Sequence, residues 1–384
     1  MDNKKKNPNV PNLRFRFDDD WKSDIFMNLV DRRSDKLKPV QLMNKDFKCI
    51  ELDSLSQETG ELLATYLAVE QRSIKNLFYK NDILYGKLRP YLRKYYKANF
   101  DGCCSSEIWV LNSKFINHDF LYHYIQTNNF NTLANISTGS KMPRADWNII
   151  SESELSYPSM EEMKKIGEFL NHIEEKIKIQ SKIIEDLKVV KEQISNQLFK
   201  LEMIYNSSYT LNDFLVEGDK TPVQTNKYRK ITIKLNKQGI IFSETNREMA
   251  DTRPFYKRYE NELIIGKQNY FNGSIALITK EFDSCICSNA IMSFKINNIN
   301  KDFLYYQISN NNYLNSQAYK ANGTGQKELS EREFLKFKVW VPTNNVQKEI
   351  VKCFKSLELK ITNEISLLSN YTLMKKYLLE NMFI

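Results

Sequence analysis

The sequence of 384 residues predicts an α/β (α+β) protein with two similar globular domains and two long antiparallel coiled-coil helices in a pseudo-twofold internal repeat. Three observations lead to this fold class. An apolar stripe with coiled-coil spacing occupies residues 163–199, the stripe returns 184 residues later, and the segments that precede the two stripes align with each other. Self-similarity at a fixed offset is the mark of a duplicated architecture.

The first helix is predicted from apolar residues that recur in alternating steps of four and three. This spacing keeps one seam on a helix, and the stretch contains no Pro. Only Gln180 and Lys191 interrupt the series, and the one glycine, Gly167, lies near its start. The predicted helix–helix seam residues are Ile166, Leu170, Ile173, Ile177, Ile184, Leu187, Ile194 and Leu198.

The second helix repeats the first, including its interruptions. Glu364 and Lys375 stand where Gln180 and Lys191 stand in the first copy, and Phe383 matches Phe199. Two long helices with the same seam and the same polar breaks indicate an internal duplication. Its predicted seam residues are Ile350, Phe354, Leu357, Ile361, Leu368, Leu378 and Met382.

The matched lysines favour an antiparallel pairing of the two helices. A parallel, in-register pair would set Lys191 against Lys375, and like charges facing across a seam are unfavourable. An antiparallel pair places each lysine near the far end of its partner. The alternative is that each helix packs on its own domain or on another protein.

The globular segments also repeat, at low identity. Residues 79–87 align with 259–267, and residues 118–130, expected to form one short amphipathic helix, align with 301–313. Strands are expected at 82–88, 105–111 and 155–158, with a polar loop at 137–144. The predicted organisation is an N-terminal tail (1–17), a first domain (18–158), a helix (159–204), a second domain (205–342) and a second helix (343–384).

The composition favours a polyanion partner and a cytoplasmic location. The net charge is +9, and the domains carry most of it, with 23 basic against 20 acidic side chains in residues 1–158 and 19 against 14 in 205–342. Such an excess is typical of nucleic-acid binding, although it also fits a lysine-rich bias without any partner. No apolar run is long enough to span a membrane, and no secretory signal is visible. The six cysteines contain no C-x-x-C pair and are expected to be reduced, mostly buried thiols.

A search for catalytic and metal motifs gives none. His118, His123 and His172 lack zinc-ligand spacing and are expected to be structural or surface residues. Gly139 and Gly325 lack the second glycine that a phosphate-binding Walker loop requires. The adenine-methyltransferase tetrapeptide of the Asn/Asp-Pro-Pro-aromatic type is also missing, so neither catalytic nor metal residues are predicted.

Basic and aromatic residues cluster at equivalent places in the two halves, and these are the candidate DNA-binding residues. Arg and Lys contact phosphates, Arg pairs with guanine, and Asn or Gln pairs with adenine. Each residue could equally be a solvated loop position, but the two halves place different polar tips on one scaffold. The candidates are Lys87, Arg89, Tyr91, Arg93, Lys94, Ser140, Lys141 and Arg144 in the first half, and Lys267, Gln268, Asn269, Tyr270, Gln326 and Lys327 in the second.

With these residues in view, the chain resembles the specificity subunits of type I restriction–modification systems over nearly its whole length. Residues 9–15, NVPNLRF, followed by Trp21 look like the N-terminal signature of many members. Residues 157–199 are similar to the central conserved region of the family, and the segment from Val341 is similar to the distal one. The family has Gln ahead of Lys-Ile in both regions, which Gln347 keeps and Met163 replaces.

The resemblance implies a non-catalytic subunit whose two globular segments are target recognition domains, each reading one half of a bipartite double-stranded DNA sequence. The helices would set the spacer between the half-sites and dock two methyltransferase subunits. Two restriction subunits would complete the complex. S-adenosylmethionine, ATP and Mg would be bound by those partner subunits, and this chain would carry no cofactor and no membrane segment.

Two other readings remain open from the sequence. The same module could serve a type II enzyme or an orphan adenine methyltransferase, which neighbouring genes would distinguish. A coiled-coil adaptor whose globular ends bind proteins is an alternative from a different class. Steep loss of duplex binding with added salt would favour DNA binding over the adaptor. An independent enzyme is disfavoured because no catalytic motif is found.

Overall fold

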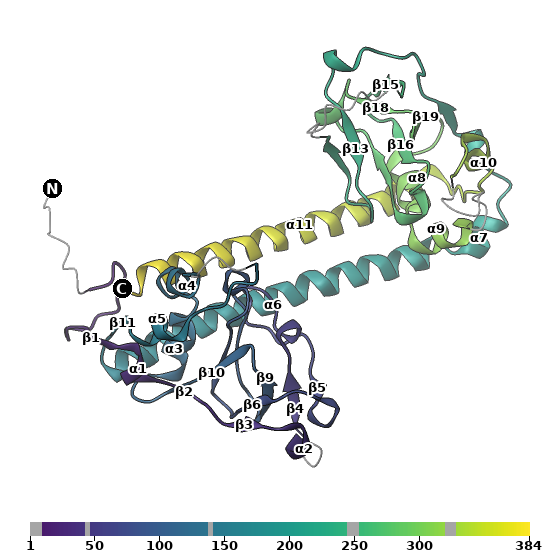
Figure 1. Ribbon diagram of the computed structural model, residues 1–384. Coiled ribbons are helices and arrows are strands. Elements are labelled where there is room, and N and C mark those ends of the chain that lie inside the picture. Colours follow the sequence, from purple (N-terminus) through teal and green to yellow (C-terminus); the bar gives the residue numbers. More distant parts are fainter. Residues whose placement is uncertain (1–9, 43–46, 137–140, 244–252, 319–327) are drawn as a thin grey trace, which may run out of the picture. The chain divides into compact units, whose positions relative to one another are not determined.

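The structure is a computed structural model that describes residues 10–42, 47–136, 141–243, 253–318 and 328–384 (Figure 1). The chain divides into two compact units: residues 1–181 with 366–384 form unit 1, and residues 182–365 form unit 2. Both predicted long helices are present, as α6 (Met160–Leu198) and α11 (Asn344–Asn381). Each unit therefore combines one globular region with a part of each long helix.

Unit 1 contains three β-sheets within its described residues. A four-stranded sheet has the order β2-β10-β7-β8, a five-stranded sheet has the order β3-β6-β9-β4-β5, and β1 pairs with β11. Its elements before α6 are β1 (Lys22–Ile25), α1 (Phe26–Leu29), β2 (Val30–Arg32), β3 (Lys36–Leu37), α2 (Pro39–Leu42), β4 (Lys48–Ile50), η1 (Leu52–Ser54), β5 (Tyr66–Leu67), η2 (Ala68–Glu70), β6 (Lys75–Phe78), β7 (Ile83–Gly86), η3 (Pro90–Leu92), β8 (Tyr95–Lys97), β9 (Gly102–Ser105), β10 (Ile108–Ser113), α3 (His118–Tyr124), α4 (Asn128–Ala134), α5 (Trp147–Ser151) and β11 (Glu154–Tyr157).

Unit 2 repeats the four-stranded sheet with the order β12-β19-β16-β17, and adds the pairs β13-β14 and β15-β18. Its elements between the long helices are α7 (Leu201–Tyr205), η4 (Leu211–Asp213), β12 (Leu215–Glu217), η5 (Thr225–Lys227), β13 (Ile231–Ile233), β14 (Ile240–Phe242), β15 (Phe255–Lys257), β16 (Leu263–Gly266), η6 (Tyr270–Asn272), β17 (Ile275–Leu277), η7 (Lys280–Phe282), β18 (Ile286–Ser288), β19 (Ile291–Ile296), α8 (Lys301–Ile308), α9 (Asn311–Gln317) and α10 (Glu331–Leu335).

The internal repeat extends to individual turns. Asn81 and Asn261 adopt the same left-handed conformation, with φ of 74° and 72°. Asn is one of the residues that tolerates this region. Beside them, the Tyr79 amide donates to the Asp82 carboxylate at 2.8 Å, and the Tyr259 amide donates to the Glu262 carboxylate at 3.3 Å. The predicted internal duplication is thus confirmed in strand order and in local hydrogen bonding.

The antiparallel arrangement of the long helices is seen in each unit separately. In unit 1, Lys375 Nζ donates to Glu174 Oε1 at 2.6 Å. In unit 2, Lys191 Nζ donates to Glu358 Oε1, also at 2.6 Å. Residues near the start of α6 therefore contact residues near the end of α11, and the reverse holds in unit 2. Each seam lysine is neutralised by a glutamate, and the two glutamates are 184 residues apart, as the duplication requires.

The helix ends also belong to the cores of the globular regions. In unit 1, Leu170 of α6 and Phe383, which follows α11, share one buried cluster with Phe120 of α3. In unit 2, Phe199 stacks on Phe354 with ring centroids 6.0 Å apart, in the cluster that includes Phe303. Every predicted seam residue is buried or half-buried. Part of the seam thus packs on the domains, in addition to the partner helix.

The prediction of one helix at 118–130 is wrong, because two helices occupy this segment. Helix α3 ends at Tyr124 and α4 begins at Asn128. Between them, the Thr127 hydroxyl donates to the Tyr124 carbonyl at 2.7 Å and accepts from the Phe130 amide at 3.3 Å. A threonine that caps a new helix in this way ends the preceding one. The second copy breaks at the same place.

Gly167 lies where α6 closely approaches α3. A Cβ atom at this position would lie 2.6 Å from Asp119 Cβ and 3.2 Å from the Phe120 amide nitrogen. Replacing a helical glycine with alanine normally stabilises a helix by about 1 kcal/mol. Here we expect Gly167→Ala to lower the free energy of unfolding by roughly 1–2 kcal/mol, because overpacking outweighs helix propensity.

Urea denaturation of the full chain measures this effect. The matched control is Asn363→Ala, an exposed position on α11, where the same propensity argument predicts a small gain. A gain at Gly167 equal to that at Asn363 would show that α3 does not press on α6.

Candidate nucleic-acid interface

The two candidate segments of unit 1 lie side by side in the structure. The Arg89 amide donates to the Pro143 carbonyl at 2.8 Å, and the Ala145 amide donates to the Lys87 carbonyl at 2.9 Å. These bonds flank an isolated bridge between Leu88 and Arg144. Loops separated by more than 50 residues in sequence thus form a single polar surface at the end of β7.

The backbone of this loop is held in an unusual conformation. Arg89 and Arg93 flank the short helix η3 and have φ of 53° and 47°, which non-glycine residues rarely adopt. Pro90 begins the turn, and Tyr91 at its tip is 55% exposed. Strained backbone persists where surrounding structure holds it, often at functional loops. Arg89 and Tyr91 therefore project outward from a rigid turn.

The cations of this surface differ in how far they are already engaged. Arg93 donates to Asn128 Oδ1 at 3.2 Å, Lys94 donates to the Leu52 carbonyl at 2.7 Å, and Arg144 pairs with Glu107 at 3.0 Å. Such partners occupy the donors that a phosphate or base would need. Within the described residues, no side-chain partner is found for Lys87, Arg89 or Lys141, which makes these three the most available cations.

Unit 2 has an equivalent loop surface, but different side chains are exposed on it. The Lys267 carbonyl accepts from the Leu329 amide at 2.9 Å, as the Lys87 carbonyl accepts from Ala145 in unit 1. Gln268 and Asn269 are exposed in the adjoining turn. The unit 2 surface is therefore amide-rich where the unit 1 surface is arginine-rich.

Tyr270 was predicted as a DNA contact, and this is wrong. Its side chain is fully buried, and its hydroxyl donates to the Ile308 carbonyl at 2.8 Å. It packs against Phe334 in the core of unit 2. A sequence pattern of basic and aromatic residues does not show which way a ring points. The candidates Ser140, Gln326 and Lys327 lie outside the described residues.

A basic segment of unit 2 was passed over. Residues 227–230, KYRK, interleave lysine, tyrosine and arginine as the first-domain segment does. In the structure the Arg229 guanidinium lies 3.2 Å from the Phe242 ring centroid, and Lys257 Nζ lies 5.2 Å from that of Tyr228. Arg229 is exposed. The same composition signal that led to residues 87–97 would have found it.

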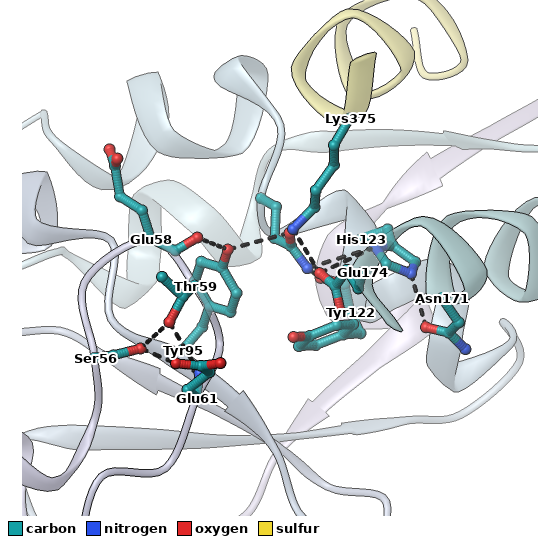
Figure 2. Close-up of polar contacts among 11 residues, drawn as sticks. Ser56, Glu58, Thr59, Glu61, Tyr95, Tyr122, His123, Asn171, Glu174 and Lys375 are labelled. Carbon is teal, nitrogen blue, oxygen red and sulfur yellow. Dashed lines mark hydrogen bonds and ion pairs between the residues drawn. The ribbon is translucent and has the colours of Figure 1, made fainter. Parts of the chain in front are cut away.

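A polar cluster around a buried histidine joins α3 to the long helices in unit 1 (Figure 2). His123 is fully buried, with Nε2 at 2.9 Å from Asn171 Oδ1 and Nδ1 at 4.0 Å from Glu174. Burial lowers the pKa of His123 to about 4, against the opposing effect of Glu174. The imidazole is therefore neutral at physiological pH and serves the packing of α3 on α6.

The stability of unit 1 should fall as the pH drops below the ordinary histidine pKa. The unfolded chain binds a proton near pH 6.5, whereas folded His123 resists it until about pH 4. Its contribution is therefore intact above pH 6.5 and is lost as the pH falls toward 4. Between pH 7 and pH 5 the loss is about 2 kcal/mol. Urea denaturation at both pH values measures it, and His123→Gln should show a smaller decrease. An unchanged decrease would assign the pH dependence to other groups.

Other chemistry was sought in the same way. Within the described ranges, no three His, Cys, Asp or Glu side chains come close enough to hold a metal ion. Five of the six cysteines are buried free thiols, and Cys353 is exposed. In the parts of the chain that are described, no helix has the length and apolar character that a membrane span needs.

Comparison with known proteins identifies the family. The model of the type I restriction modification DNA specificity domain matches twice, over residues 32–189 and 206–368. The specificity subunit of the type I restriction enzyme EcoDI from Escherichia coli is 37% identical over 95 residues, which span 24% of this chain and 21% of that protein. The matched region thus covers about a fifth of that relative.

Solved structures share the fold. One match has a TM-score of 0.60 and 12% identity, and it covers 94% of this chain and 97% of the other. That chain comes from work on the structural basis underlying complex assembly and conformational transition of the type I R-M system. The type I S subunit from M. genitalium matches with a TM-score of 0.57 and 15% identity, covering 98% and 99%.

The duplicated fold with its paired loops and the two family matches define a DNA-binding protein of restriction–modification systems. The chain belongs to the family of type I restriction–modification DNA specificity subunits.

Proposed function

We propose that each globular region reads one half of a bipartite DNA sequence, and that the chain supplies sequence specificity to partner enzymes. The observation that carries this proposal is that the two units have equivalent loop surfaces with different exposed side chains. Arg89 and Tyr91 project from one, and Gln268 and Asn269 are exposed on the other. Arginine suits guanine edges and amides suit adenine edges, so the two surfaces would read different bases.

We further propose that the chain acts without a catalytic centre or cofactor of its own. Two methyltransferase subunits would dock on the long helices, and two restriction subunits would complete the assembly. The methyltransferases would bind S-adenosylmethionine and extrude an adenine from each half-site, because a base inside a duplex is out of reach of the chemistry. ATP and Mg would be bound by the restriction subunits. Family membership and the duplicated support for two equivalent partners favour this assignment.

Arg89→Ala tests the reading surface. We expect the affinity for the cognate duplex to fall about ten- to a hundredfold, in line with the roughly 1–3 kcal/mol of a base contact, with relaxed specificity at one position. Lys87→Ala should instead weaken binding to all duplexes and reduce the salt slope by about one. Binding is measured by titration at several salt concentrations with the methyltransferase present.

The matched control is Lys182→Ala on α6, whose ammonium pairs with Asp186 at 3.1 Å on the helix surface. It should leave both affinity and salt slope unchanged. If Arg89→Ala bound cognate and unrelated duplexes like the wild type, the surface at the end of β7 would not be the reader.

A further inference from the structure

Unit 2 contains a cavity, and side chains among the described residues of unit 1 narrow the equivalent place there. The cavity has a volume of about 480 Å³ and lies among α6, α8, α11 and the turn between β13 and β14. All of its lining residues belong to unit 2. Small-molecule sites commonly have volumes of about 300–1,000 Å³. The cavity is therefore large enough for a ligand of nucleotide size.

The internal repeat shows why this space is closed in unit 1. There, Gly60 packs so tightly that a Cβ would collide with the Tyr122 hydroxyl and lie 2.9 Å from Tyr95. The Tyr95 hydroxyl donates to the Glu58 carbonyl at 2.6 Å and to Gln126 at 3.2 Å. Polar side chains and the loop itself thus fill the place beside the long helices.

The equivalent loop of unit 2 leaves the space open. Lys237 corresponds to Glu58, since both have φ near 60° and donate their amides to equivalent carbonyls, Lys237 to Gly273 at 2.9 Å and Glu58 to Arg93 at 3.1 Å. Two residues further on, Gly239 has no neighbouring atom within 4 Å of its ideal Cβ. By register, smaller Ile275 replaces Tyr95, and by alignment Ser309 replaces Gln126.

The same replacements change the charge of the cavity. Lys188, Lys191 and Lys237 bring three ammonium groups to it, against the carboxylates of Glu192 and Glu358. Lys191 pairs with Glu358 at 2.6 Å, and Lys237 lies 3.8 Å from Glu192. Lys188 has no described partner, and its counterpart in unit 1 is the neutral Thr372. One positive charge is therefore left uncompensated.

The cavity also contains an acceptor without a donor. Glu192 Oε1 is shielded from solvent and has no hydrogen-bond partner. Leaving a buried acceptor unpaired is unfavourable, and a ligand N–H group would relieve this cost. Tyr305 lies on the cavity wall beside Tyr306, with ring centroids 5.8 Å apart. Aromatic rings of this kind provide faces on which a planar base can stack.

We propose that this cavity binds a nucleoside phosphate, with its phosphates on Lys188 and a base N–H group donating to Glu192. Such a ligand has a negative charge for Lys188, an N–H donor for Glu192 and a planar ring that can stack on Tyr305. The site lies in unit 2 alone and involves none of the candidate reading residues. Nucleotide binding is measured without DNA, so failure of the proposed DNA reading would leave its result unaffected.

Isothermal titration of the purified full chain tests the proposal with ATP, GTP and CTP, and with inorganic tripolyphosphate as a probe that lacks the base. We expect one saturable site for at least one nucleotide, and at least tenfold weaker binding of tripolyphosphate. Lys188→Thr and Ser309→Gln, which install the unit 1 residues, should each weaken binding at least tenfold. Thr372→Lys is the matched control and should add no second site.

Four results would contradict the proposal. The first is no saturation by any nucleotide at millimolar concentration in a chain whose circular dichroism shows it to be folded. The second is equal affinity for tripolyphosphate, which would indicate phosphate binding alone. The third is wild-type nucleotide affinity in both Lys188→Thr and Ser309→Gln. If Lys188→Thr weakened only duplex binding, the lysines would serve DNA phosphates and the free-nucleotide site would be rejected.

Discussion

Lys375→Met is expected to lower the free energy of unfolding of unit 1 by roughly 3 kcal/mol, because it leaves Glu174 without its partner. Lys375 is 9% exposed, and its ammonium lies 2.6 Å from a carboxylate that also faces fully buried His123. An unpaired charge in such a place costs several kcal/mol, far more than the intact pair contributes.

The internal repeat provides the control for this prediction. Lys191 occupies the equivalent position in unit 2, but its side chain and that of Glu358 are 31% and 41% exposed. Water can solvate the carboxylate left behind, so Lys191→Met should cost at most about 1 kcal/mol. Chemical denaturation, with the two units followed separately, compares the variants. Equal losses at both sites would contradict the role assigned to burial.

Exchanging the charges of Glu174 and Lys375 tests whether the pairing of opposite charges, and not the lysine itself, stabilises this position. Glu174→Lys combined with Lys375→Glu keeps one charge of each sign across the same helix pair. It should recover most of the stability lost in Lys375→Met, since opposite charges again face each other. Failure to recover would indicate that His123 or another neighbour, and not the pair itself, requires the lysine at this position.

Replacing residues 18–158 with the corresponding domain of another family member should change one half of the DNA sequence that directs modification. The original half should be lost, because each mismatched base pair costs about 1–3 kcal/mol and several would mismatch together. The other half should remain, since unit 2 keeps its own loops. The exchanged domain must retain the residues that meet α6 and α11, because Phe120 shares a core with Leu170 and Phe383.

Sequencing that detects methylated adenines reads out this exchange in cells. The control is the parent chain with Lys87→Ala, where loss of a phosphate contact should weaken modification without changing its sequence. A change in both halves would mean that the domains do not read independently. No change in either half would place sequence reading outside residues 18–158.

The long helices and the duplication were predictable because the spacing of apolar residues, and its recurrence, can be read directly from the sequence. The four-three spacing predicted α6 and α11, and the polar breaks at Lys191 and Lys375 predicted their antiparallel pairing. The break between α3 and α4 was missed because Thr127 is compatible with a helix interior. Only its hydrogen bonds in the structure show that it caps a new helix.

The sequence predicted which residue types form the candidate reading surface. It did not predict which of their side chains point outward. The structure brings Arg89 against Pro143 and leaves its side chain exposed, as a reader needs. The same pattern led to Tyr270, which is a core residue. Whether a side chain in a basic, aromatic turn points outward depends on strand register and turn geometry. Neither is encoded in residue type alone, so the individual contacts needed the structure.

The most direct test of the central claim, that this chain selects the DNA sequence on which partner enzymes act, is to map methylated adenines in cells with and without its gene. We predict one bipartite sequence, with two dissimilar halves at a fixed separation, whose modification disappears when the gene is deleted and returns when it is restored. Modification that persists unchanged after deletion, or that follows a single uninterrupted sequence, would contradict the account.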